Sequence, residues 1–204
     1  MLYPQMAPFI FDCRTCPSPC DGESKGSYIF ENDLELSEHY ENRIMAYICS
    51  KGVYETKKAE GVGFPDIEVV QTDGEIKAFL EVKVQQRTFM RVADRLPLSE
   101  LLPSETLALN LSDLKRYFDI FDSEQKPIYI VWVLLNRPCI LGDTSYRLYT
   151  QKIEVLREIY EKYGDKRRFR RKSGSGDVVD GKHLGVVINY HFSIKELEEW
   201  SVVL

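Results

Sequence analysis

Apolar residues recur along the chain with two different periods, and the change of period marks the expected elements. Spacings of three and four residues predict helices over about residues 37–50, 112–121 and 150–163. Alternating or continuous apolar runs predict strands over 67–70, 76–84, 128–135 and 184–192. Ser37 and Ser112 are suited to cap the first two helices. A helix followed by a continuously apolar strand is typical of an α/β protein.

Other segments have weaker patterns. Residues 87–103 and 166–182 show no sustained period and are expected to be loops. Ser193 and Glu196 form a capping-box pattern, which predicts a short final helix.

One pair of expected strands is joined by Asp73-Gly74, a strong signal for a β-hairpin. Antiparallel pairing about this turn places Asp66 opposite Glu81. Alternation along the second strand turns Lys83 to the same face as Glu81. We therefore expect two carboxylates and an amino group to converge at this point of the sheet.

Length and composition favour one folded domain. The chain has 204 residues, of which 44% are hydrophobic and 29% are charged, enough to bury a substantial core. We expect a Cys- and Pro-rich extension over residues 1–30 and one domain over 31–204. The longest apolar run, 128–135, is shorter than the roughly 20 residues of a membrane span. Since no signal-peptide pattern is present either, we expect a cytoplasmic protein with no membrane partner.

Two facing carboxylates repel each other unless a cation lies between them. A set of oxygen ligands favours Mg²⁺ or Mn²⁺, which keep several waters and bind phosphate oxygens. The amino group of Lys83 adds positive charge where negative charge develops during phosphodiester hydrolysis. The hairpin therefore predicts a phosphodiesterase that depends on Mg²⁺ or Mn²⁺.

The two half-motifs Pro65-Asp66 and Glu81-Val82-Lys83, spaced across a hairpin, resemble the catalytic core of the PD-(D/E)xK nuclease superfamily. The Gly-Val-Gly-Phe-Pro-Asp segment that ends at Asp66 is most similar to VRR-type and Holliday-junction-resolvase-like nucleases. The resemblance spans the first helix, the hairpin, the second helix and the buried strand. It implies a restriction-endonuclease-like α/β core, with a mixed central β-sheet flanked by helices.

The resemblance also implies roles for individual residues. The implied metal ligands are Asp66, Glu81, the main-chain carbonyl of Val82 and, from the preceding helix, Glu41. Lys83 would orient the attacking water or stabilise the transition state, and Gln85 would contact phosphate or water. Glu38 is the alternative to Glu41.

The function we expect is a metal-dependent DNA endonuclease of restriction or repair type, as a homodimer if both strands are cut. The same chemistry would also permit an RNA substrate. The alternative is a non-catalytic nucleic-acid-binding or assembly subunit that keeps the fold. Such a subunit would use the cysteine segment and the basic loop for docking. For the individual residues, the alternative is that Asp66 is only a turn residue and that Glu81 with Lys83 is only a solvated strand face.

The net charge is −5 at pH 7, yet six of the seven residues from 166 to 172 are basic. A local cationic patch can bind nucleic-acid phosphates even on an acidic protein. The expected DNA contacts are Lys166, Arg167, Arg168, Arg170, Arg171 and Lys172. Phe169 is placed to stack on an unpaired base. The alternative is a solvated loop or a helix end.

Cys13, Cys16 and Cys20 have a spacing that could hold Zn²⁺ as a structural metal. The candidates for a fourth ligand are Cys49, Cys139 and His39. An iron–sulfur cluster and ordinary free thiols are the alternatives. The three histidines, His39, His183 and His191, have neither metal-ligand nor catalytic spacing among themselves, and we assign them no role.

Overall fold

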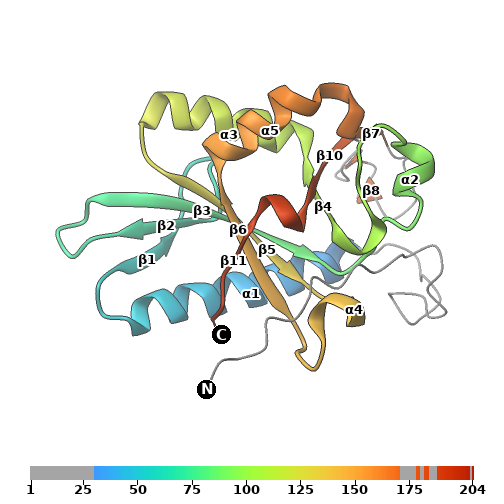
Figure 1. The fold of residues 1–204 in the computed structure, drawn as a ribbon. Coiled ribbons are helices and arrows are strands. Elements are labelled where there is room, and N and C mark those ends of the chain that lie inside the picture. The colour runs from blue at the N-terminus through green and yellow to red at the C-terminus, as the bar shows by residue number, and fades with distance from the viewer. Residues whose placement is uncertain (1–29, 171–177, 180–181, 184–187, 203) are drawn as a thin grey trace, which may run out of the picture.

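The computed structural model describes residues 30–170, 178–179, 182–183, 188–202 and 204 (Figure 1). Its main body is a six-stranded sheet, with the strands in the spatial order β1 (Glu55–Lys58), β2 (Ile67–Val70), β3 (Ile76–Gln85), β5 (Ile128–Leu134), β6 (Arg147–Lys152) and β11 (Glu198–Glu199). β3 and β5 are parallel, and the other neighbouring pairs are antiparallel. The protein is therefore a mixed α/β fold, as the sequence predicted.

A smaller antiparallel sheet lies beside the main one. Its strands, in spatial order, are β4 (Thr106–Asn110), β10 (Ile188–Ser193) and β7 (Arg168–Arg170). Two further short strands, β8 (Val178–Val179) and β9 (Lys182–His183), pair with each other. Figure 1 shows this part of the molecule next to α2 (Val92–Arg95).

Helices cover both faces of the main sheet. The remaining helices are α1 (Phe30–Ser50), α3 (Leu111–Glu124), α4 (Pro138–Leu141) and α5 (Ile153–Tyr163), with 3-10 turns at Pro103–Glu105, Gly164–Arg167 and Ile194–Glu196. α1 lies on one side of the sheet, and α3 and α5 lie on the other (Figure 1). None of the described helices is long and apolar enough to cross a membrane.

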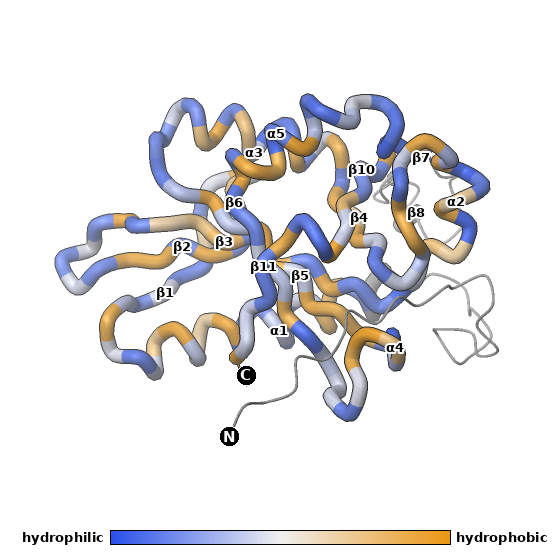
Figure 2. Tube along the Cα trace, in the orientation of Figure 1, coloured by the Kyte–Doolittle hydropathy of each residue, from blue (hydrophilic) through white to orange (hydrophobic). Residues whose placement is uncertain are grey.

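The two faces of the sheet have separate cores. On the α1 side, Tyr40 and Ile44 pack with Leu80 and Val82. On the opposite side, buried residues of β5 pack against α3, α5, β4 and β10, and Trp132 is completely buried there. Apolar and hydrophilic residues alternate along α3 and α5 in Figure 2, as expected for helices that cover a sheet with one face. β3 and β5 therefore lie between two helical layers.

Several predicted elements are confirmed. The strands at 67–70, 76–84 and 128–135 correspond to β2, β3 and β5 with bounds that differ by one residue at most. The capping box is also confirmed, because Ser193 Oγ accepts from Lys195 N while Glu196 Oε2 accepts from Ser193 N. It begins a 3-10 turn of three residues, so the final helix is shorter than a regular α-helix.

Some predicted helix boundaries are wrong. α1 begins at Phe30, so Ser37 lies inside the helix and does not cap it. α3 is capped by the side chain of Asn110, which accepts from Ser112 N, one of the free amides at a helix start. Residues 150–152 belong to β6, because pairing with β5 satisfies their backbone groups before α5 begins.

The loop predictions are also partly wrong. Residues 87–103 include α2, and 166–182 include β7, β8 and β9. β10 begins at Ile188, and residues 184–187 of the strand predicted at 184–192 lie outside the described part. β1 and β4 were not predicted at all, because β1 has the polar sequence Glu-Thr-Lys-Lys and β4 is held by pairing with the distant β10. Long-range pairing therefore decided these elements.

Candidate active site

The β2–β3 hairpin brings the two predicted half-motifs together. Its register pairs Ile67 with Leu80, so Asp66 and Glu81 lie one residue beyond a paired position on neighbouring strands. The Val82 amide donates to Asp66 Oδ2 at 2.8 Å, which fixes the Asp66 carboxylate against β3. Because N–H and C=O of one residue in a strand point to the same side, the Val82 carbonyl is directed toward the same edge. The expected convergence of Asp66 with Glu81 therefore follows from the observed register.

The loop that leads into Asp66 is held by α3, which covers the face of the sheet opposite α1. Gly63 has a φ of +84°, and Arg116 of α3 donates from Nε to its carbonyl at 2.7 Å. A Cβ on Gly63 would lie 2.9 Å from Arg116 Cδ, so the close approach favours glycine here. Arg116 also pairs with Asp113, one turn earlier, at 2.6 Å. This loop is thus anchored to α3 immediately before the first carboxylate.

Glu81 is the most deeply buried carboxylate of the group, with a side chain 2% exposed. Its Oε1 forms an ion pair with Lys83 of the same strand. Its Oε2 is buried and has no hydrogen-bond partner. A buried carboxylate oxygen without a partner is costly, and such atoms mark places where a ligand or ion completes the structure.

Asp66 has an unusual ionisation equilibrium. Burial raises its pKa from 3.8 to about 7, and the negative charges of Glu81 and Glu41 act in the same direction. The Lys83 charge and the Val82 amide lower the pKa but do not outweigh burial and repulsion. Burial and the neighbouring carboxylates together therefore make the charged form of Asp66 costly.

Lys83 and Tyr117 lie beside the carboxylates, and the pKa values of both side chains are raised. Burial alone would lower the pKa of Lys83, but the charges of Glu81 and Asp66 outweigh it and raise the pKa above its ordinary value. Lys83 therefore stays a cation at neutral pH. Burial, the charge of Glu81 and a hydrogen bond to Glu81 raise the pKa of Tyr117 far above its ordinary range. Tyr117 was predicted only as part of the apolar face of its helix.

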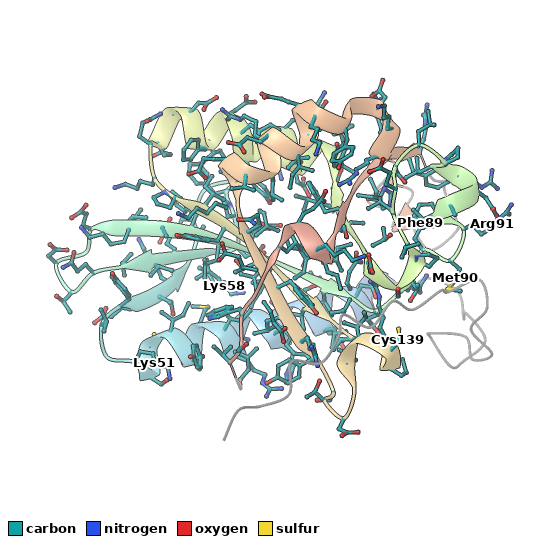
Figure 3. All side chains as sticks on the ribbon, viewed as in Figure 1. Lys51, Lys58, Phe89, Met90, Arg91 and Cys139 are labelled. Atoms are coloured by element: carbon teal, nitrogen blue, oxygen red, sulfur yellow. The ribbon has the colours of Figure 1, made fainter. Side chains whose placement is uncertain are left out.

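Glu41 lies within electrostatic range of Asp66, but its carboxylate already has a protein partner. It is buried on α1 and forms an ion pair with Lys58 of β1. Figure 3 shows Lys58 at the β1 side of the sheet, above α1. The alternation of β1 that turns Lys58 toward α1 could have been a signal for this pair, but the strand itself was not predicted. Glu38, the alternative, is exposed.

The residues present fit a hard cation with few protein ligands. In the described part of the chain, no group of three or more His, Cys, Asp or Glu side chains is arranged to hold a metal ion. Mg²⁺ and Mn²⁺ commonly take one or two carboxylates and fill the remaining positions with water and phosphate oxygens. The unpartnered Glu81 Oε2 and the raised pKa of Asp66 are both features that a cation would relieve. Asp66, Glu81 and the Val82 carbonyl form such an oxygen set.

Gln85 is used partly inside the fold. Its Oε1 accepts from the Ala108 amide at 2.7 Å, which ties the end of β3 to β4. The side chain also lines a cavity of about 530 Å³ that begins beside Lys83. Gln85 thus lies on the same strand as Glu81 and also contributes to the lining of that cavity.

The structure separates the predicted basic residues into two kinds. The Arg167 side chain is 3% exposed, pairs with Glu196 at 2.6 Å and donates to the Ser99 carbonyl. Its charge is therefore used inside the protein, so Arg167 is not available for the DNA contact that the sequence predicted. In contrast, Lys166, Arg168 and Arg170 are exposed. The last two residues of the predicted set, Arg171 and Lys172, lie outside the described residues.

The predicted cysteine site is not covered by the structure. Cys13, Cys16 and Cys20 lie outside the described residues, as does the extension expected at 1–30 up to residue 29. Of the candidates for a fourth ligand, Cys49 is exposed near the end of α1, with its Sγ 3.2 Å from Thr56 Oγ1. The zinc site stays a prediction.

Comparison with solved structures finds remote structural likenesses. A solved structure of Archaeoglobus fulgidus Hjc, a Holliday junction resolvase from an archaeal hyperthermophile, overlaps 80% of this chain and 91% of its own chain. The TM-score is 0.41 and the sequence identity is 12%, values that carry no argument about activity. No family model matches the sequence, and no curated protein matches it.

Proposed function

We propose that this chain is a Mg²⁺- or Mn²⁺-dependent nuclease that hydrolyses phosphodiester bonds in DNA, of the PD-(D/E)xK type. The observation that carries the proposal is the buried, unpartnered Oε2 of Glu81 on β3, the strand whose Val82 amide also binds the Asp66 carboxylate. Metal-assisted phosphodiester hydrolysis requires carboxylates that bind a metal ion and a positive charge near the phosphate. Asp66 and Glu81 supply the two carboxylates, and Lys83 supplies the positive charge.

Each residue has a distinct role in this proposal. Asp66, Glu81 and the Val82 carbonyl would hold the metal, which when bound supplies an acidified water and neutralises phosphate charge. Lys83 remains protonated, so it acts as a fixed positive charge toward the phosphate and does not serve as a general base. Tyr117 stays neutral beside Glu81. Glu41 adds negative charge near Asp66.

A plasmid nicking assay tests this proposal. With Mg²⁺ or Mn²⁺ the wild-type chain should convert supercoiled DNA into nicked or linear DNA. Lys83→Ala should lower the cleavage rate by about 10²- to 10³-fold, because a fixed charge at the transition state is lost. Lys77→Ala is a matched control, since Lys77 lies on the same strand but pairs with the exposed Glu75. It should keep the wild-type rate.

Two results would contradict the nuclease proposal: no cleavage of DNA with either metal, or full activity of Lys83→Ala. Matched RNA and DNA strands in the same assay distinguish the two substrate classes. DNA is expected to be cleaved faster.

A second candidate is a non-catalytic nucleic-acid-binding subunit. The ion pairs Lys83–Glu81 and Lys58–Glu41 favour it, because two of the acidic groups already have protein cations as partners. Thermal unfolding with added Mn²⁺ separates the candidates. The nuclease should gain stability from Mn²⁺, and Asp66→Asn should abolish the gain. A subunit that only binds DNA should show no gain and should bind DNA equally in EDTA.

A further inference from the structure

The cavity of about 530 Å³ is lined by Lys83 and Gln85 and also by Thr88, Phe89, Phe169 and His191. Its volume falls within the range of pockets that hold small organic ligands. The residues come from the end of β3 and the segment after it, and from β7 and β10 of the smaller sheet. Figure 3 shows Phe89 in this part of the molecule, on the side of α2. The cavity therefore has Lys83 of the proposed catalytic site in its lining together with an aromatic wall.

Three rings form that wall. Phe89 lies 5.1 Å from Phe169 and 5.0 Å from His191, measured between ring centroids. Alternation along β7 turns Phe169 inward and leaves Arg168 and Arg170 exposed. Flat aromatic surfaces of this kind are suited to stacking against a planar ring.

Thr88 gives the cavity a second signal for a ligand. Its residue is 5% exposed, and its Oγ1 has no hydrogen-bond partner. A buried hydroxyl in this state is costly, and a ligand that hydrogen-bonds to it would recover the lost energy. The position of Thr88 in the cavity lining, next to Phe89, places this polar group beside the aromatic wall.

Three further polar side chains of the lining are neutral and can form hydrogen bonds. Burial lowers the pKa of His191 to about 4, so the ring is neutral at physiological pH. Its Nδ1 lies 3.1 Å from the Arg167 carbonyl, which can only accept, so Nδ1 carries the proton and Nε2 is an acceptor. The amides of Gln86 and Asn189 also line the cavity.

The charged side chains of the lining give no excess of positive charge for an anionic occupant. Asp33 and Asp113 line the cavity together with the cations Lys83 and Arg87, and Lys83 is already paired with Glu81. A phosphate group inside would meet carboxylates as well as cations, whereas a neutral planar ring with polar edges would meet aromatic faces, an unpaired hydroxyl and amides. These properties together describe a heterocyclic base.

We propose that this cavity binds one unpaired nucleobase of the DNA strand whose phosphate reaches Lys83. The proposal rests on the proposed function and narrows its substrate to DNA that presents an unstacked base next to the scissile phosphate. The base stacks against Phe89 and Phe169 and hydrogen-bonds to Thr88, while Arg168 and Arg170 on the outer side of β7 face the adjoining backbone.

Fluorescence polarisation in EDTA tests this inference without cleavage. The full chain is titrated with a labelled strand of about 20 thymidines and with an abasic strand that has the same number of phosphates. The wild type should bind the thymidine strand at least about tenfold more tightly, because only that strand can fill the cavity. Equal affinity for the two strands overturns the inference.

Two variants assign the preference to the cavity. Thr88→Val keeps the side-chain shape and removes the buried hydroxyl, and it should reduce the preference by about three- to tenfold. Phe89→Ala should remove most of the preference while affinity for the abasic strand stays the same. Tyr54→Ala, which changes an exposed aromatic residue at the start of β1, is the control and should retain the wild-type preference.

The variants keep the inference falsifiable. If Phe89→Ala fails to fold, Thr88→Val alone decides, and an unchanged preference in that variant contradicts the base-binding role. The outcome is also separate from catalysis. A chain that never cleaves DNA but prefers the thymidine strand would refute the proposed nuclease and leave the cavity assignment standing.

Discussion

Two clusters of buried charged side chains in this protein differ in how many of their charged atoms have partners within the chain. In the first, Arg167 pairs with Glu196, donates to the Ser99 carbonyl and lies 3.5 Å from the centre of the Tyr163 ring. In the second, Glu81 has one buried oxygen without a partner, and the pKa of Asp66 is raised to about 7. The first group is complete within the chain, whereas the second is incomplete.

The difference assigns a structural role to the first group and supports the functional role that we propose for the second. A buried ion pair whose members all have partners holds elements together, and here it ties the 3-10 turn before β7 to the turn that follows β10. A buried group with unbalanced charge costs stability and persists at sites that bind something. A basic residue in the sequence is therefore no guide to DNA binding until its burial is known.

The largest expected effect comes from breaking the complete group. Arg167→Ala should lower the free energy of unfolding by about 3–5 kcal/mol, because it leaves Glu196 with an uncompensated charge. The neighbouring Arg168 is exposed, and its ion pair with the exposed Asp165, at 3.4 Å, is weak. Arg168→Ala should therefore change the free energy of unfolding by less than about 1 kcal/mol. Urea unfolding measures both. Equal, small losses would show that Arg167 does not hold the two turns together.

A substitution in the incomplete group, Asp66→Asn, should raise the free energy of unfolding, whereas Arg167→Ala lowers it. The folded-state pKa of Asp66, about 7, is above the ordinary 3.8, so the folded protein binds the extra proton between these values. Stability from this group is present at low pH and is lost as pH rises through 7. Asp66→Asn, in EDTA, should therefore be more stable than the wild type by about 2–4 kcal/mol near pH 8 and similar to it near pH 4.

Urea unfolding of both proteins across this pH range measures the difference, and Glu60→Gln, which changes an exposed acid of the preceding loop, is the control. A variant that is less stable than the wild type near pH 8 would mean that the Asp66 carboxylate is balanced by the protein itself.

The smallest effect is expected at the exposed arginines. Arg168→Ala with Arg170→Ala should reduce the slope of log affinity against log salt by about 0.7 per residue on single-stranded DNA. Arg167 does not reach the surface, so it should contribute nothing to that slope. Fluorescence polarisation at several salt concentrations measures it. An unchanged slope in the double variant would remove β7 from the DNA-contacting surface.

The sequence predicted the hairpin of the candidate site well because the signals there are local. An Asp-Gly turn, two-residue alternation and a fixed strand register together determine that Asp66 faces Glu81. The buried strand β5, which lies beside β3, follows from an equally local pattern of continuous apolar residues. No contact with a distant residue is needed for these conclusions.

Other features depended on contacts between distant segments. β4 and β6 form because β10 and β5 satisfy their backbone groups, and Tyr117 reaches Glu81 because α3 packs on that face of the sheet. The sequence gives no signal for the burial of Arg167 or for the unpaired hydroxyl of Thr88.

The sequence alone determined where the two carboxylates and Lys83 lie relative to each other, because strand alternation and turn geometry act over a few residues. The tertiary structure alone decided which charges are buried, which are paired and where a cavity opens beside Lys83. The physical reason is that desolvation and ion pairing depend on every element packed around a group, and those elements come from distant parts of the chain.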